Sequence, residues 1–167
     1  MKKLYIIRHA KSSWKDKKLG DFERPLNKRG MLDAPFMGNL LKSRGVIPDI
    51  ILLSPALRTK TTAEMIANTL KFTKSIVMNK DIYEAGANTL HKIVTKIDDK
   101  NETAFLIGHN PGLNMLAERY VDMYDNIPTC GIVEIEFDCE SWRQISPENA
   151  KFISFEYPKK YKVETDR

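Results

Sequence analysis

Three stretches of the chain repeat one order of local patterns: a short apolar run, a loop with turn residues, and an amphipathic helix. The apolar runs lie at 4–7, 50–53 and 104–107. Strands that alternate with helices pair in parallel, because each helix carries the chain back across the sheet. We therefore predict an α/β fold, a three-layer α/β/α sandwich with a mostly parallel central sheet.

The first of these helices is predicted at about 28–43. Asn27 is its candidate N-cap and Gly45 its candidate C-terminal stop. Pro35 falls inside this segment, and a proline in a helix interior indicates either a kink or a later start of the helix.

The remaining elements follow from periodicity. The second and third helices are predicted to end near residues 70 and 121, and a further helix spans about 89–97. A short strand is expected at 75–78. The segments 132–137 and 150–157 alternate apolar and polar residues, which is typical of half-exposed strands added antiparallel at one sheet edge.

The chain of 167 residues shows no internal repeat, low-complexity tract or linker, so we expect a single domain over 1–167. No apolar run has the length of a secretory signal or of the roughly 20 residues that span a membrane. Cys130 and Cys139 lack metal-ligand spacing. We therefore expect a cytoplasmic protein with no membrane partner.

The net charge of +5 raises the alternative of a nucleic-acid-binding module. The lysines are scattered, however, and no aromatic residues are spaced as a stacking platform within a basic stripe. We expect a solvated basic surface with a mild preference for anions and no nucleic-acid partner.

Cationic and imidazole side chains follow the three apolar runs. Arg8 and His9 come directly after the first run, Arg58 lies in the first turn of the helix after the second, and His109 follows the third. The carboxyl ends of parallel strands meet at one edge of a sheet, where ligands bind. We therefore expect these four side chains to form one site.

Such a cluster suits the transfer of a phosphoryl group. Guanidinium forks of Arg8 and Arg58 match phosphate oxygens. A neutral His9 can attack phosphorus while a protonated His109 donates to an oxygen as charge builds. We expect a backbone carbonyl, not identifiable from sequence, to fix the tautomer of His9. This chemistry needs no cofactor and predicts a metal-independent phosphatase.

Glu84 lies in the loop after the 75–78 strand and is the candidate acid for the leaving group, provided that burial raises its pKa. The alternative is a structural ion pair with Arg58 or Arg8. His91 falls within a predicted helix, and we interpret it as a surface or core residue.

These residues resemble the signature of the histidine phosphatase superfamily, which includes the cofactor-dependent phosphoglycerate mutases. Arg-His at 8–9, Ser-Pro-x-x-Arg at 54–58 and Gly-His at 108–109 match it in order. More narrowly, four segments resemble its SixA-type phosphohistidine phosphatase branch: 8–14, 24–30, 83–85 and 108–112. The resemblance covers about 4–137.

The resemblance implies a phosphoglycerate mutase-like fold, a phosphohistidine intermediate at His9 and a phosphate pocket without metal formed by Arg8, Arg58 and His109. Ser12 and Asn110 lie within the matching segments and are further candidates for phosphate contact.

The chain also departs from the mutases. Only 25 positions separate Glu84 from His109, too few for the long segment that covers small substrates in those enzymes. An open pocket suits a phosphorylated protein, phosphohistidine above all. A broad small-molecule phosphomonoesterase is the alternative, and a non-catalytic phosphate- or nucleic-acid-binding module is the alternative from another class.

Overall fold

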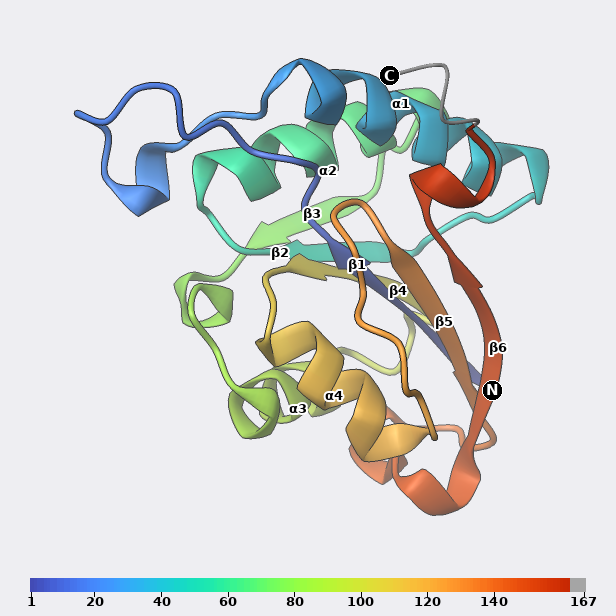
Figure 1. The fold of residues 1–167 in the computed structure, drawn as a ribbon. Helices are drawn as coiled ribbons and strands as arrows, with labels where there is room; N and C mark the ends of the chain where they lie inside the picture. The colour runs from blue at the N-terminus through green and yellow to red at the C-terminus, as the bar shows by residue number, and fades with distance from the viewer. Residues whose placement is uncertain (163–167) are drawn as a thin grey trace.

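The computed structural model describes residues 1–162, which form a six-stranded sheet with helices on both faces (Figure 1). The strands are β1 (Lys2–Arg8), β2 (Ile50–Leu53), β3 (Ser75–Met78), β4 (Thr103–Gly108), β5 (Ile132–Phe137) and β6 (Ala150–Glu156). Their order is β3-β2-β4-β1-β5-β6. The first four run parallel, while β5 pairs antiparallel with β1 and β6 pairs antiparallel with β5 at the sheet edge. The sheet predicted from the sequence is confirmed.

Two pairs of helices complete the layers. The four α-helices of the described residues are α1 (Lys28–Ser43), α2 (Leu57–Leu70), α3 (Ala87–Thr95) and α4 (Gly112–Tyr120). In Figure 1, α1 and α2 lie over one face of the sheet, and α3 and α4 lie over the other. The three-layer sandwich is therefore confirmed, with α3 beginning and ending two residues earlier than predicted.

The central strands are apolar on both faces because both faces are covered. Along β1, Leu4 and Ile6 belong to the core under α3 and α4, whereas Tyr5 and Ile7 belong to the core under α1 and α2. Successive side chains of a strand point to opposite faces, so an uninterrupted apolar run is what a strand buried on both sides requires.

The amino-terminal end of α1 is fixed against the loop that follows β1. The Asn27 side chain accepts a hydrogen bond from the Gly30 N–H at 2.9 Å, which confirms the predicted N-cap. A Cβ on Gly30 would lie only 2.2 Å from the Lys11 carbonyl oxygen, so only glycine permits this approach. The helix runs through Pro35, and the later start considered above is wrong.

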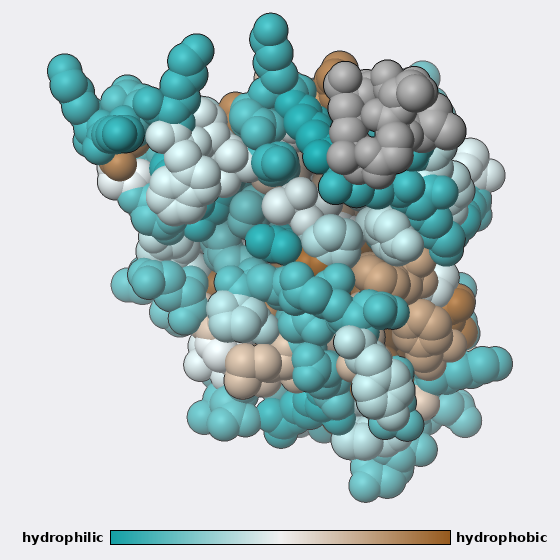
Figure 2. Space-filling model, in the orientation of Figure 1, coloured by the Kyte–Doolittle hydropathy of each residue, from teal (hydrophilic) through white to brown (hydrophobic). Residues whose placement is uncertain are grey.

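The surface in Figure 2 is largely hydrophilic, with hydrophobic side chains gathered over β5 and β6. β6 contributes the exposed Phe152 and Ile153 to the surface. Among the described residues, no helix combines the length and the apolar character needed to span a bilayer.

Candidate active site

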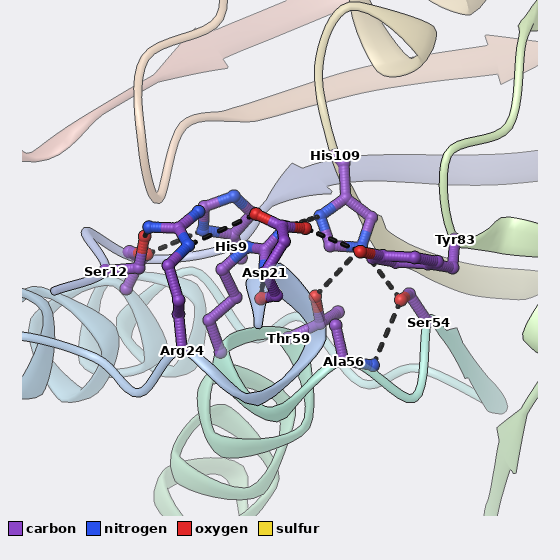
Figure 3. A network of polar contacts seen from close by, with 11 residues as sticks. His9, Ser12, Asp21, Arg24, Ser54, Ala56, Thr59, Tyr83 and His109 are labelled. Carbon is purple, nitrogen blue, oxygen red and sulfur yellow. Dashed lines mark hydrogen bonds and ion pairs between the residues drawn. The ribbon is translucent and has the colours of Figure 1, made fainter. Parts of the chain in front are cut away.

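A cavity of about 690 Å³ opens at the carboxyl edge of the parallel strands. Arg8 ends β1 and His9 follows it, Arg58 lies in the first turn of α2, and His109 follows β4. All four line this cavity. The rings of His9 and His109 lie side by side with their centroids 5.3 Å apart (Figure 3). The structure therefore brings together the four residues that the sequence placed after three strands.

The tautomer of His9 is set by the backbone of the next residue. Its Nδ1 lies 2.7 Å from the Ala10 carbonyl oxygen. A carbonyl only accepts hydrogen bonds, so Nδ1 carries the proton and Nε2 keeps its lone pair. Burial is the main cause that lowers the pKa of His9 to about 3; the hydrogen bond to Ala10 opposes this shift, and the nearby His109, Arg58 and Arg8 add to it. His9 is therefore a neutral imidazole with Nε2 available for attack.

Helix α2 braces the residue that orients His9. The Thr62 hydroxyl accepts a hydrogen bond from the Ala10 N–H at 2.9 Å and donates one to the Arg58 carbonyl at 2.8 Å. Ala10 and Thr62 have no exposed surface. The Thr62 hydroxyl thus connects Ala10, in the loop after β1, to the turn of α2 that carries Arg58.

Two of the three arginines that line the cavity, Arg8 and Arg58, keep a buried donor without a partner among the described residues. Arg8 donates from Nη1 to the Ile127 carbonyl at 2.9 Å, and Arg58 donates from Nη1 and Nη2 to Asp21. The Nε atoms of Arg8 and Arg58 are buried without a hydrogen-bond partner among the described residues. Buried donors are nearly always paired in proteins, and an oxyanion in the cavity is the natural partner for these two.

The ring of His109 is neutral beside Arg58. Its Nδ1 lies 3.4 Å from Arg58 Nη2, and its Nε2 lies 2.8 Å from the Ser54 hydroxyl oxygen. Because a guanidinium only donates, Nδ1 is the acceptor and Nε2 carries the proton. Burial, followed by the charge of Arg58, lowers the pKa of His109 to about 4. The protonated form needs an anion beside it, and here Arg58 lies there instead.

Asp21 is a member of the site that the sequence reasoning missed. Its Oδ2 accepts hydrogen bonds from the Tyr83 hydroxyl at 2.6 Å and from Arg58 Nη2 at 3.0 Å, while Arg24 Nε lies 3.2 Å from Oδ1 (Figure 3). The Tyr83 hydrogen bond, aided by the two arginines, lowers the pKa of Asp21 to about 2. The same bond raises the pKa of Tyr83 to about 12. Asp21 is therefore an ionised partner of Arg58.

Arg24 is a second residue without an assigned role in the sequence reasoning. It is buried, donates from Nη1 to the Ser12 hydroxyl oxygen at 2.7 Å, and places its guanidinium carbon 3.4 Å from the centroid of the Trp14 ring. One signal could have found it: Arg24 lies in a segment that matches the SixA-type branch. For Asp21, the only signal in the sequence was its place in the long loop that follows β1.

Glu84 lies at the rim of the cavity rather than inside it. It lines the cavity but is exposed, so the burial that was expected to raise its pKa is absent. The alternative of an ion pair with Arg58 or Arg8 is also wrong, since the carboxylate bound to Arg58 is that of Asp21. Across residues 1–162, no three His, Cys, Asp or Glu side chains gather as a metal-binding group.

Asn110 and His91 have partners within the protein. Asn110 Oδ1 accepts from the Asn114 N–H at 3.0 Å, and its Nδ2 donates to the Ile127 carbonyl at 3.0 Å. Asn110 thus fixes the start of α4 at the wall of the cavity. His91 lies on α3 beside the Tyr120 hydroxyl, half-buried and outside the cavity lining, in agreement with its interpretation as a surface or core residue.

Comparison with known proteins decides the family. A family model described as the histidine phosphatase superfamily, branch 1, matches residues 4–127. This chain belongs to the histidine phosphatase superfamily. Among curated relatives, an uncharacterized chloroplastic protein of Arabidopsis thaliana is 31% identical over 153 residues, which cover 86% of this chain and 70% of that protein.

Solved structures of SixA proteins share the fold over nearly the whole length of both chains. A candidate phosphohistidine phosphatase SixA from Agrobacterium tumefaciens superposes with a TM-score of 0.81 at 25% identity, covering 94% of this chain and 98% of that one. The protein histidine phosphatase SixA complexed with tungstate gives a TM-score of 0.82 at 19% identity, covering 96% and 99%. The phosphoglycerate mutase-like fold expected from the resemblance is confirmed.

Proposed function

We propose that this histidine phosphatase hydrolyses a phosphoryl group carried on a protein, phosphohistidine above all, by way of a phosphohistidine at His9. One observation carries the proposal: the lone pair of His9 Nε2 is held free by the Nδ1–H bond to Ala10, beside Arg8 and Arg58, which each keep a buried and unpartnered Nε. A nucleophile and donors for a tetrahedral dianion thus share one cavity, and the reaction requires no metal.

In the first step, His9 Nε2 attacks phosphorus and an N–P bond forms while the bond from phosphorus to the leaving group breaks. Arg8 and Arg58 bind the non-bridging oxygens. The dianion raises the pKa of His109, whose Nδ1 takes up a proton and donates to a third oxygen. Ser12 and Asn110, which line the same cavity, supply further polar contacts.

The leaving group then takes a proton from Glu84 or from water. Water attacks the phosphohistidine in the second step: a P–O bond forms, and the N–P bond breaks and returns its electron pair to His9 Nε2. Phosphate leaves, and the proton of the water passes to Glu84 or to solvent. Glu84 is exposed and is not held inside the cavity, so this route favours leaving groups that depart without help from a positioned acid. The nitrogen of phosphohistidine is such a group.

The open rim of the cavity supports a protein as the substrate. Only α3 and β4 lie between Glu84 and His109, and no residue of either element lines the cavity. Trp14, which also lines the cavity, is 72% exposed. A phosphorylated side chain projecting from a protein can enter such an opening. The SixA structure with bound tungstate, a tetrahedral oxyanion like phosphate, is consistent with a phosphate site in this fold.

The test compares substrates across two variants. His9→Ala should abolish turnover of both a phosphohistidine-containing protein and an aryl phosphate, because the nucleophile is lost. Glu84→Gln should slow aryl phosphate hydrolysis by about 100-fold, the lower end of general acid catalysis, and should slow phosphohistidine hydrolysis far less. Rates of phosphate release measure both effects.

The control is Glu64→Gln, which removes an exposed carboxylate of α2 and should leave both rates unchanged. Equal losses of both activities in Glu84→Gln would rule out a role for Glu84 that depends on the leaving group. Faster turnover of common sugar phosphates than of the phosphoprotein by the unmodified enzyme would favour the small-molecule phosphomonoesterase instead.

A further inference from the structure

A second cavity, of about 390 Å³, lies directly beside the catalytic one. The two share three lining residues, Arg8, Lys11 and Thr129. We call this second cavity the annexe. Because Arg8 is common to both, a group bound in the annexe lies next to the phosphoryl group that we place against His9.

The annexe is strongly basic. Among residues 1–162, Arg8, Lys11, Arg29 and Lys159 line it, against a single carboxylate, Asp33. That carboxylate is already neutralised: it is buried, it accepts from Lys162 Nζ at 2.7 Å, and Arg29 Nε lies 3.5 Å from it. The remaining positive charge faces solvent, since the side chains of Lys11 and Lys159 are exposed.

Besides Arg8 and Lys11, three separate segments of the chain line the annexe. Arg29 lies in the first turn of α1, whose amino-terminal end adds its own positive dipole. Thr129 lies in the loop before β5, and Lys159 lies in a short 3₁₀ turn, Pro158–Lys160, after β6. Figure 1 shows this turn and the loop before β5 beneath α1. None of these segments carries a residue with a role in the proposed phosphoryl transfer.

The lining is mixed rather than purely polar. Pro128, Tyr157 and Pro158 add apolar surface between the cations. A carboxylate on a hydrocarbon stem fits both parts of such a lining, because the stem covers the apolar surface and the carboxylate reaches the lysine and arginine heads. A second phosphate group of a small substrate would use the charges but not the apolar surface.

We propose that the annexe binds an acidic side chain of the phosphorylated protein, located within two residues of the phosphorylated one. This inference rests on the proposed function and names what the enzyme reads in its substrate besides the phosphoryl group. An extended chain advances about 3.3 Å per residue, so a neighbouring glutamate can enter the annexe while the phosphoryl group occupies the catalytic cavity.

The test uses two phosphohistidine peptides that are identical except for Glu or Gln at the positions flanking the phosphohistidine. The unmodified enzyme should show a kcat/KM about fivefold higher on the Glu peptide, the size expected for one or two partly exposed charge pairs. The double variant Arg29→Gln/Lys159→Gln should lose this preference and keep its rate on the Gln peptide. Raising the ionic strength should shrink the preference in the unmodified enzyme.

The matched control is Lys71→Gln/Lys151→Gln, which removes two exposed lysines from outside both cavities and should keep the preference. Equal rates on the two peptides, or a preference that survives in the annexe variant, would overturn the proposal. A small bisphosphate favoured over its monophosphate, without a peptide preference, would also overturn it. Failure of the proposed function would give a different result, because neither peptide would then be hydrolysed by way of His9.

Discussion

At the scale of single residues, two neighbours fix the tautomer and the position of the His9 ring. The Ala10 carbonyl holds the proton on Nδ1, and the Thr62 hydroxyl holds the Ala10 N–H. Burial and the surrounding cations keep the ring neutral, with a pKa of about 3. The imidazole therefore does not lose its nucleophilic lone pair to a proton until the solution is strongly acidic, and it needs no base to activate it.

His109 should change its protonation state when an oxyanion binds. Without a ligand its pKa is about 4, below that of an ordinary histidine, so the ring is neutral at neutral pH. A dianion beside Nδ1 favours the charged form and raises this pKa. Binding of tungstate at mildly alkaline pH should therefore take up a proton. Calorimetric titration in two buffers of different ionisation enthalpy measures this uptake.

The control for proton uptake is His109→Gln, which should bind tungstate more weakly and with no dependence of the binding enthalpy on the buffer. Binding enthalpies that are the same in both buffers for the unmodified protein would show that His109 stays neutral, and its role as a charged donor would then be wrong.

At the scale of elements, the amino-terminal end of α1 contributes to the stability of the fold and also holds the loop that carries His9. Its N-cap, Asn27, donates its backbone N–H to the Lys11 carbonyl at 3.0 Å and accepts from Gly30 with its side chain. The cap therefore closes the helix and fixes the loop that begins with His9. Losing the side-chain bond leaves a buried helix terminus with an unpaired donor.

Asn27→Ala should lower the free energy of unfolding by about 1 kcal/mol, which corresponds to a fall in Tm of about 2–4 °C for a domain of this size. Thermal or urea unfolding followed by circular dichroism measures the change. Asn39→Ala is the control, because Asn39 is exposed in the interior of the same helix and alanine is the better helix former. An equal loss in both variants would mean that the cap contributes nothing.

The regular elements were predictable because their periodicity follows from burial on both faces of the sheet. The strands 75–78 and 132–137 and the helix 28–43 were placed with the observed bounds. The loop between His9 and Asn27 has no such period, so its folding back over the cavity was not predictable. The contacts of Asp21 with Arg58 and Tyr83 depend on that loop.

At the scale of the whole molecule, topology assembles the site. Parallel pairing of β1 with β4, and of β4 with β2, brings the carboxyl ends of three strands to one edge. Arg8, Arg58 and His109 are far apart in sequence and meet there. The sequence could predict this meeting, since it follows from strand order, but it could not predict the annexe, whose walls come from α1, the loop before β5 and the turn after β6.

The central claim is that the phosphoryl group passes through His9, and trapping the intermediate tests it most directly. The enzyme is mixed with phosphoramidate as the phosphodonor, quenched in alkali, digested and examined by mass spectrometry. We expect a single acid-labile phosphoryl adduct on His9 that is absent in His9→Gln. An adduct on another residue, or phosphate release that continues undiminished in His9→Gln, would contradict it.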